Sequence, residues 1–227
     1  MKRGLNSNQL KLLAMITMTV DHAGLMLFPD SVWMRVVGRL AFPIYAYMIA
    51  EGCRHTRSMG RYLCSLGVMA LVCQLAYFFA MGSLYQCIMV TFSLSVGLVW
   101  VLRWGFSRGF PGRLLGIAAV LLTLFLTEIL PLLLPHTDYA VDYGFIGVML
   151  PVVLCLCKTK VQRLWAAAVL LGLMCMNSWQ GQWFCLLSLP LLALYNGSRG
   201  RRGMKWVFYF YYPAHLLLLQ GISMLMI

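Results

Sequence analysis

Residues 61–103 read RYLCSLGVMALVCQLAYFFAMGSLYQCIMVTFSLSVGLVWVLR. This segment contains two apolar stretches, 62–82 and 85–102, joined by a short turn and bounded by Arg61 and Arg103. A helix needs about 20 apolar residues to cross a bilayer, so each stretch is long enough to span one. Similar stretches recur on both sides and predict nine spanning helices, at 10–28, 32–52, 62–82, 85–102, 114–134, 143–157, 164–179, 182–196 and 206–227.

The composition of the whole chain agrees with this pattern. The 227 residues are 62% apolar and 11% charged, and no stretch has the composition of a soluble domain. No internal repeat and no linker is visible in the sequence. The first apolar run contains Asp21 and His22 and lacks the small-residue pattern of a signal cleavage site, so we expect it to be retained. The sequence therefore predicts an all-α, polytopic membrane helix bundle, with residues 1–227 forming one integral membrane domain.

The basic residues indicate how the bundle is oriented. Apart from Arg35 and Arg39, the 18 Lys and Arg residues lie at 2–11, 54–61, 103–113, 158–163 and 199–205, in every second gap between apolar stretches. Positive residues concentrate on the cytoplasmic side of membrane proteins, so we expect an inside N-terminus and an outside C-terminus. The net charge of +12 comes from short clusters that flank apolar spans, a pattern typical of topology signals rather than nucleic-acid binding.

The eight cysteines do not form a ligand pattern. Most lie within apolar stretches, where cysteine behaves as a small hydrophobic residue. The closest pair, Cys155 and Cys157, is not a CxxC motif and has no histidine nearby. We predict neither a metal site nor a disulfide framework.

Four ionisable residues are expected at one depth in the outer half of the bundle. A helical rise of about 1.5 Å per residue places Asp21 and His22 of the first span at the level of Arg39 in the second and Glu128 in the fifth. Asp142 and Asn177 are expected above them, near the outer surface. Ionisable groups within spans are costly and usually mark sites or pathways, so this layer is the main candidate site.

Within this layer, Asp21 is expected to pair with Arg39, and His22 is the candidate general base. A carboxylate can fix the tautomer of an imidazole and raise its basicity. Adjacent helical residues point about 100° apart, which makes Glu128 a better partner for His22 than Asp21. The alternative is that His22 is a hydrogen-bonded residue without a chemical role.

Two prolines are expected to disturb the helices that carry these groups. Pro43 cannot donate to the carbonyl of Arg39, so the second span should kink there, with Arg35 and Arg39 on one face. Arg35 has the alternative of extending to the membrane surface. Pro213 has the same effect in the last span, close to His215, which is either a hydrogen-bonded core residue or a second candidate base.

A second polar layer is expected at the inner side. Glu51 and His55 are four residues apart and share a helix face. Arg54, Arg57 and Arg61 follow with i, i+3, i+7 spacing, which predicts a basic stripe on the cytoplasmic turn. Guanidinium groups bind phosphate well, so the stripe either holds a phosphorylated ligand or serves only as a topology anchor.

Several motifs resemble the TraX family. The N-terminal motif comprises Leu10-Lys11-Leu12, Thr19-Val20-Asp21-His22, Gly38-Arg39-Leu40-Ala41-Phe42-Pro43-Ile44-Tyr45-Ala46-Tyr47, Glu51-Gly52 and His55-Thr56-Arg57. Later stretches, 142–148 and 208–216, also match, and the similarity extends from about residue 8 to the C-terminus. The family's founding member is associated with N-terminal acetylation of conjugative pilin at the bacterial inner membrane. The family is similar in turn to the membrane acyltransferases of acyltransferase family 3, which carry a histidine in the first span and use cytosolic acyl-CoA.

The resemblance implies an acetyltransferase of the bacterial cytoplasmic membrane that uses acetyl-CoA as co-substrate and no metal. The implied catalytic residues are His22, Asp21, Arg39, Glu128 and His215. The implied acetyl-CoA site comprises Arg54, Arg57, Arg61, Glu51 and His55. The acceptor, an amine or hydroxyl of a small molecule, lipid, glycan or peptide N-terminus, is implied to approach from outside past Arg35, Asp142, Tyr143 and Asn177.

Two other functions are compatible with the sequence. Buried Asp, Glu, His and Arg on interrupted helices also suit a proton-coupled transporter, although no inverted repeat is visible in the sequence. A non-catalytic membrane scaffold would leave the charges within the spans without a purpose.

Overall fold

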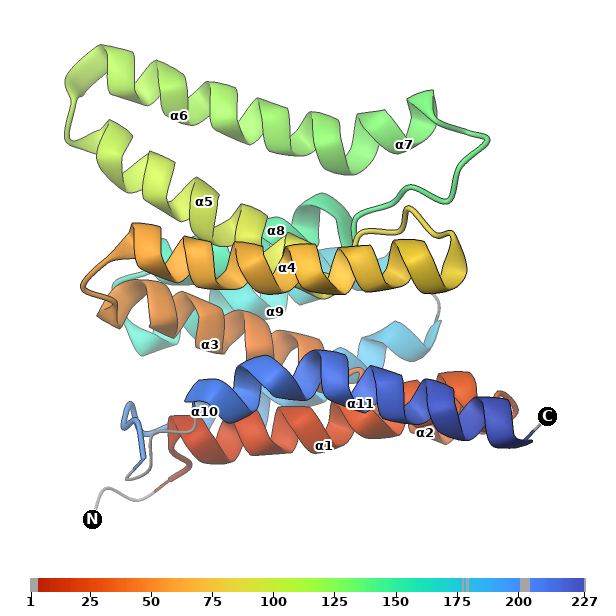
Figure 1. The fold of residues 1–227 in the computed structure, drawn as a ribbon. Coiled ribbons are helices and arrows are strands. Elements are labelled where there is room, and N and C mark those ends of the chain that lie inside the picture. Colours follow the sequence, from red (N-terminus) through yellow and green to blue (C-terminus); the bar gives the residue numbers. More distant parts are fainter. Residues whose placement is uncertain (1–3, 177, 179, 201–204, 227) are drawn as a thin grey trace. The chain divides into compact units, whose positions relative to one another are not determined.

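A computed structural model describes residues 4–176, 178, 180–200 and 205–226 (Figure 1). The chain is all-α, as predicted, and most of the predicted spans coincide with a helix. The elements are α1 (Ser7–Met26), α2 (Val32–Gly38), α3 (Ala41–His55), α4 (Met59–Met81), α5 (Ile88–Phe106), α6 (Gly109–Leu124), the π-helix η1 (Phe125–Ile129), α7 (Leu130–Leu133), α8 (Gly144–Leu156), α9 (Lys160–Met176), the 3₁₀ helix η2 (Gln180–Leu187), α10 (Ser188–Ala193) and α11 (Lys205–Met226).

The chain forms two compact units. The first comprises Met1–Met48 and Leu164–Ile227, and the second comprises Ile49–Arg163. The boundaries fall inside α3 and α9, so each of these helices contributes to both units.

The first unit is built on α1. Asn6 caps this helix in a capping box with Gln9, which satisfies backbone donors at the helix start. The helix packs against α2 and α11, and α1 and α11 run side by side (Figure 1). Close approach of α2 depends on Gly24 and Gly38, since a Cβ on Gly24 would lie 2.7 Å from that of Met34 and a Cβ on Gly38 would overlap the Asp21 side chain.

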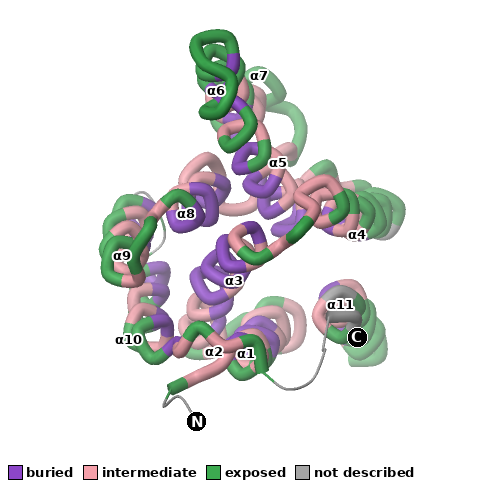
Figure 2. Tube along the Cα trace, turned by 90° about the vertical axis from the view of Figure 1, so that its left-hand side faces the viewer, coloured by how far each residue is buried: buried purple, intermediate pink, exposed green. Residues whose placement is uncertain are grey.

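The second unit is built on α5. This helix packs against α4, α6 and α8. Val96 and Val99 are fully buried, and the Ser95 hydroxyl donates to the carbonyl oxygen of Val148 at 2.8 Å. Figure 2 shows α6 largely exposed and α8 largely buried. The exposed face of α6 is apolar, which suits contact with lipid.

Within the described part of the chain, three helical segments are long and apolar enough to cross a membrane, namely Met59–Phe79, Ile88–Phe106 and Gly109–Leu133. They correspond to the third, fourth and fifth predicted spans. The helix Gly144–Leu156 is apolar but shorter. The chain is therefore a helical membrane protein, and the count of nine spans remains a prediction.

The second predicted span is divided into two helices. Helix α2 ends at Gly38 and α3 begins at Ala41, which puts Arg39 at the break. Pro43 is the third residue of α3, where its missing N–H costs no intrahelical bond. The predicted kink is thus a full break, and it frees the Arg39 side chain to turn toward α1.

The fifth and eighth predicted spans are not regular α-helices throughout. The fifth contains a π-helical turn at 125–129, just before Pro131, which lacks the N–H that would bond the carbonyl of Thr127. The eighth starts as a 3₁₀ helix and becomes α-helical only at Ser188. Pro190 leaves the carbonyl of Leu186 without an α-helical donor, close to the point where the winding changes.

Candidate functional site

An ion cluster in the first unit joins α1 to the break after α2. Nη2 of Arg39 donates to both carboxylate oxygens of Asp21, at 2.9 and 3.1 Å. Nη1 of Arg35 lies 3.0 Å from Oδ2 of the same carboxylate and also donates to the Asp21 backbone oxygen. The side chains of Asp21 and Arg39 are only 14% and 12% exposed. The predicted Asp21–Arg39 pair is confirmed, and Arg35 joins it rather than extending away.

Gln182 completes the support of Arg39. Its Oε1 accepts a hydrogen bond from Arg39 Nη1 at 3.1 Å, and Arg39 Nε donates to the carbonyl of Arg35. Gln182 is buried and lies in the 3₁₀ helix η2. Groups on α1, α2 and η2 therefore hold the Arg39 guanidinium. The guanidiniums of Arg35 and Arg39 share the Asp21 carboxylate, which leaves one positive charge in excess.

His22 is hydrogen-bonded to His215. Nδ1 of His22 lies 2.9 Å from Nε2 of His215, and the ring centroids are 5.0 Å apart. His215 is buried, and its Nδ1 lies 2.9 Å from the carbonyl oxygen of Tyr211. The expectation that His215 is a hydrogen-bonded core residue is confirmed. Its bond to His22 was not predicted, and it forms because α11 packs beside α1.

Tyr211 fixes the His215 ring from one side. The two rings stack with centroids 4.6 Å apart and planes 5° from parallel. The Tyr211 hydroxyl donates to the carbonyl of Met15 at 2.5 Å and also contacts the Thr19 hydroxyl. These contacts tie α11 to α1 and set the orientation of both histidines.

The hydrogen bonds define the tautomers of two neutral rings. A carbonyl oxygen only accepts, so His215 carries its proton on Nδ1, where it donates to Tyr211. Nε2 of His215 is then an acceptor, and His22 donates to it from Nδ1. His22 Nε2 consequently carries a lone pair, and no hydrogen-bond partner for it exists among the described residues. The arrangement leaves an unprotonated nitrogen on the His22 ring, on which Arg35 and Arg39 act electrostatically.

Glu128, Asp142 and Tyr143 belong to the second unit. Glu128 Oε1 accepts from the backbone N–H of Phe145 at 2.7 Å, which caps the start of α8. Asp142 Oδ1 accepts from the Tyr85 hydroxyl at 2.7 Å, and Tyr143 adopts a left-handed backbone conformation with φ 61°. Glu128 thus has a structural partner of its own, and its predicted role toward His22 stays a prediction. Asn177 lies outside the described residues.

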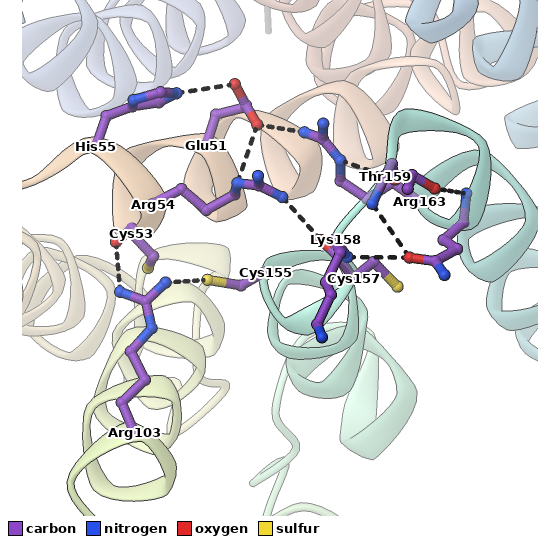
Figure 3. A network of polar contacts seen from close by, with 11 residues as sticks. Glu51, Cys53, Arg54, His55, Arg103, Cys155, Cys157, Lys158, Thr159 and Arg163 are labelled. Carbon is purple, nitrogen blue, oxygen red and sulfur yellow. Dashed lines mark hydrogen bonds and ion pairs between the residues drawn. The ribbon is translucent and has the colours of Figure 1, made fainter. Parts of the chain in front are cut away.

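A second polar cluster surrounds Glu51 in the second unit (Figure 3). Glu51 is buried and lies 3.4 Å from His55 Nε2, which confirms their shared helix face. It also contacts the guanidinium of Arg163, and Arg54 Nε lies 3.9 Å away. The Nη1 group of Arg54 donates to the carbonyl of Cys157 at 2.8 Å.

Arg54, Arg57 and Arg61 lie around a turn, as predicted, but they do not form a stripe with helical i, i+3, i+7 spacing. Helix α3 ends at His55, and α4 begins at Met59 after a turn that Ser58 caps through the backbone N–H of Arg61. The i, i+3, i+7 spacing therefore crosses a helix boundary. Arg57 and Arg61 are exposed, whereas Arg54 is part of the Glu51 cluster.

The sequence reasoning missed two arginines of this cluster. Arg103 of α5 donates from Nη1 to the carbonyl of Cys53 at 2.8 Å and from Nη2 to Cys155 Sγ at 3.1 Å. Arg163 of α9 contacts Glu51 directly. Both arginines were interpreted from the sequence only as topology signals. The signal that could have found them is that Glu51 is the only acidic residue between positions 31 and 127, so several arginines compete for it. No group of three or more His, Cys, Asp or Glu side chains suited to a metal occurs among the described residues.

A model of the TraX protein family matches residues 6–223. The chain belongs to the TraX family. The family match covers nearly the whole chain, including His22, His215 and the Glu51 cluster. The resemblance drawn from the motifs is confirmed.

Two relatives extend this comparison of the TraX-family chain. A Dichelobacter nodosus protein described as "Probable fimbrial assembly protein FimC, serogroup H1" is 27% identical over 244 residues, which cover 95% of each chain. An uncharacterized protein of Rickettsia prowazekii (strain Madrid E) is 50% identical over 38 residues, or 17% of this chain and 15% of that protein. No solved structure matches the chain.

Proposed function

We propose that this protein is a membrane acetyltransferase that moves the acetyl group of acetyl-CoA to an amine or hydroxyl acceptor. The observation that carries the proposal is the orientation of His22, whose Nδ1–H is held by His215 so that Nε2 is available as a base. Membership of the TraX family supports the choice of acyl transfer. The paired arginines beside the ring supply the positive charge that acyl transfer requires.

The chemistry follows from these groups. His22 Nε2 takes the proton of the acceptor N–H or O–H as the acceptor attacks the acetyl carbonyl. Negative charge develops on the carbonyl oxygen, where Arg39 or Arg35 stabilises it. The bond from carbon to the CoA sulfur then breaks, and His22 returns the proton to the departing thiolate. The products are the acetylated acceptor and CoA, and no covalent enzyme intermediate forms.

His215 and Asp21 support this reaction without contacting the substrate. His215 keeps His22 in one tautomer and accepts its Nδ1–H when the ring becomes cationic. Asp21 fixes both guanidiniums and neutralises one of them. The remaining positive charge is then directed to the acetyl oxygen.

The acceptor is proposed to be reached from outside the cytoplasmic membrane, in a nine-span topology with the N-terminus inside. The alternation of basic segments supports this orientation. The Dichelobacter relative is described as a probable fimbrial assembly protein, which favours a peptide N-terminus as the acceptor. Reporter fusions in each predicted loop test the topology, and a cytoplasmic C-terminus would contradict it.

Binding of acetyl-CoA separates this proposal from a proton-coupled transporter. Purified protein in detergent is titrated with acetyl-CoA, and release of CoA thiol is followed in the presence of pooled membrane and periplasmic extracts as acceptor. We expect saturable binding and acceptor-dependent thiol release that the His22→Gln variant lacks. Proton-coupled solute uptake into vesicles, without acetyl-CoA binding, would instead favour the transporter.

A further inference from the structure

The Glu51 cluster contains more positive than negative charge. Arg54, Arg103 and Arg163 come from three helices, and Glu51 is the only acidic residue between positions 31 and 127. The other acidic residues of the second unit make contacts of their own, Glu128 with the N–H of Phe145, Asp138 with Ser83 and Asp142 with Tyr85. Arg54 and Arg163 lie against the Glu51 carboxylate, and Arg103 adds a third positive charge beside Cys53 and Cys155. The three guanidiniums together carry two more charges than the one carboxylate balances.

The guanidiniums are also held in fixed positions. Arg54 donates to the carbonyl of Cys157, Arg103 to that of Cys53, and Arg163 Nε to that of Thr159. Figure 3 shows Arg54 and Arg163 on either side of the Glu51 carboxylate, with Arg103 beside Cys53 and Cys155. A guanidinium has five N–H donors, and the printed contacts of the exposed Arg103 use its two Nη groups, one on the carbonyl of Cys53 and one on Cys155 Sγ.

Burial makes the excess charge costly. The side chains of Arg163 and Glu51 are only 12% and 11% exposed, and that of Arg54 is 27% exposed. Partly buried charges are normally paired, because little water is available to solvate them. Arg103 is exposed, so the cluster is open to solvent on its side.

We propose that Arg54, Arg103 and Arg163 bind a phosphate-bearing ligand whose negative charge balances the cluster. Rigid, forked guanidiniums match the oxygens of phosphate and pyrophosphate better than a single carboxylate does. The ligand is the pyrophosphate portion of a nucleotide thioester, an assignment that rests on the proposed acetyltransferase function. The anion site itself stands on charge and geometry alone. The same phosphate chemistry is offered by anionic lipid headgroups and by free pyrophosphate.

The decisive experiment compares variants with and without the cluster charge. Arg103→Gln removes the exposed guanidinium of the cluster, while Arg113→Gln removes an exposed arginine of the same unit that makes no contact with Glu51. Binding of CoA, of pantetheine (which lacks phosphate) and of inorganic pyrophosphate is measured by calorimetry in neutral detergent, and lipid binding with vesicles containing phosphatidylglycerol. We expect Arg103→Gln to raise the Kd for CoA and pyrophosphate about tenfold to a hundredfold, as for the loss of a charge-assisted hydrogen bond.

The control and the other ligands make the outcome unambiguous. Arg113→Gln should change the Kd for CoA less than about threefold, and Arg103→Gln should not alter pantetheine binding. Arg103→Lys, which keeps the charge, should recover part of the affinity. Each variant is compared by its elution from a sizing column, so that a loss of folding is recognised. Arg54→Gln serves as the second variant if Arg103→Gln does not fold.

The results separate the two proposals. If CoA binds equally well to Arg103→Gln and Arg54→Gln, the anion site is wrong and the acetyltransferase proposal survives. If CoA does not bind, but pyrophosphate or phosphatidylglycerol binds in a manner that depends on Arg103, the anion site is correct and the acetyl-CoA assignment fails. If no phosphate-bearing probe depends on Arg103 or Arg54, the cluster is only a topology anchor.

Discussion

His22 and His215, 193 positions apart, share a hydrogen bond of 2.9 Å between Nδ1 and Nε2. The direction of that bond gives the two rings different tasks. The Tyr211 carbonyl holds the proton of His215 on Nδ1, so His215 accepts and His22 donates. This bond direction agrees with the proposed roles, in which His22 is the base and His215 its positioning residue.

Substitution of His215 tests this division of roles. His215→Gln retains a side-chain oxygen able to accept the His22 Nδ1–H, so we expect acetyl transfer within about tenfold of wild type. His215→Leu removes the acceptor and should lower kcat about 10²-fold with little change in the KM for acetyl-CoA. The measurement is steady-state acetyl transfer by both variants. Equal and near-complete loss in the two would make His215 itself the base.

Gly38 keeps α2 close enough to α1 for the Asp21 cluster to form. A Cβ at this position would overlap the Asp21 side chain, so Gly38→Ala should displace Asp21 from Arg39 and destabilise the protein by about 1–3 kcal/mol. The matched control is Gly67→Ala in α4, where a Cβ would meet no atom within 4 Å. Thermal unfolding in detergent measures both. A melting temperature of Gly38→Ala as high as that of Gly67→Ala would show that the close approach is unimportant.

Asp138 joins two loop segments of the second unit in a manner that depends on pH. Its carboxylate accepts from the Ser83 hydroxyl at 2.5 Å and from the N–H of Leu84 at 2.8 Å. Hydrogen bonding by Ser83 and then by Leu84 lowers the pKa of Asp138 below its ordinary value of 3.8. The group is fully exposed and the folded-state pKa is depressed, so its contribution is present above the unfolded pKa and is lost as the pH falls through the folded one.

Amide exchange at Leu84 follows this contact. At pH 6 the exchange should be a few-fold faster in Asp138→Asn than in wild type, because the charged acceptor is gone. The difference should vanish at a pH below the lowered pKa of Asp138. Asp30→Asn, which removes an exposed acid of the first unit, is the control and should leave Leu84 unchanged. Equal exchange in wild type and Asp138→Asn at pH 6 would exclude the contact.

Much of the fold could be predicted from local sequence. Apolar stretches of sufficient length, basic flanks and turn residues located most of the helices, because these signals act within one segment. The Asp21–Arg39 pair was predicted from membrane depth alone. Two opposite charges at the same depth in an apolar setting are expected to pair, because an unpaired buried charge is costly. Pro43 correctly marked the interruption of the second span.

The remainder depends on packing or on helix ends. The His22–His215 bond requires α11 to lie beside α1, which no periodicity in either segment indicates. The basic stripe failed because Ser58 starts a new helix between Arg54 and Arg61. Arg103 and Arg163 reach the Glu51 cluster from helices distant in sequence. Their sequence positions, next to the ends of apolar stretches, indicated only that these ends lie on the cytoplasmic side.

Acetylation in cells tests the central claim most directly. Strains lacking the gene, or expressing wild type, His22→Gln or His22→Ala, are compared by mass spectrometry of envelope proteins, lipids and metabolites. We predict that one class of molecule gains a single acetyl group only with wild type, and that both variants, made and inserted at normal levels, lose activity by about 10²–10⁴-fold. The same acetylated species at wild-type levels in the His22→Gln strain would contradict the assignment of His22 as the base.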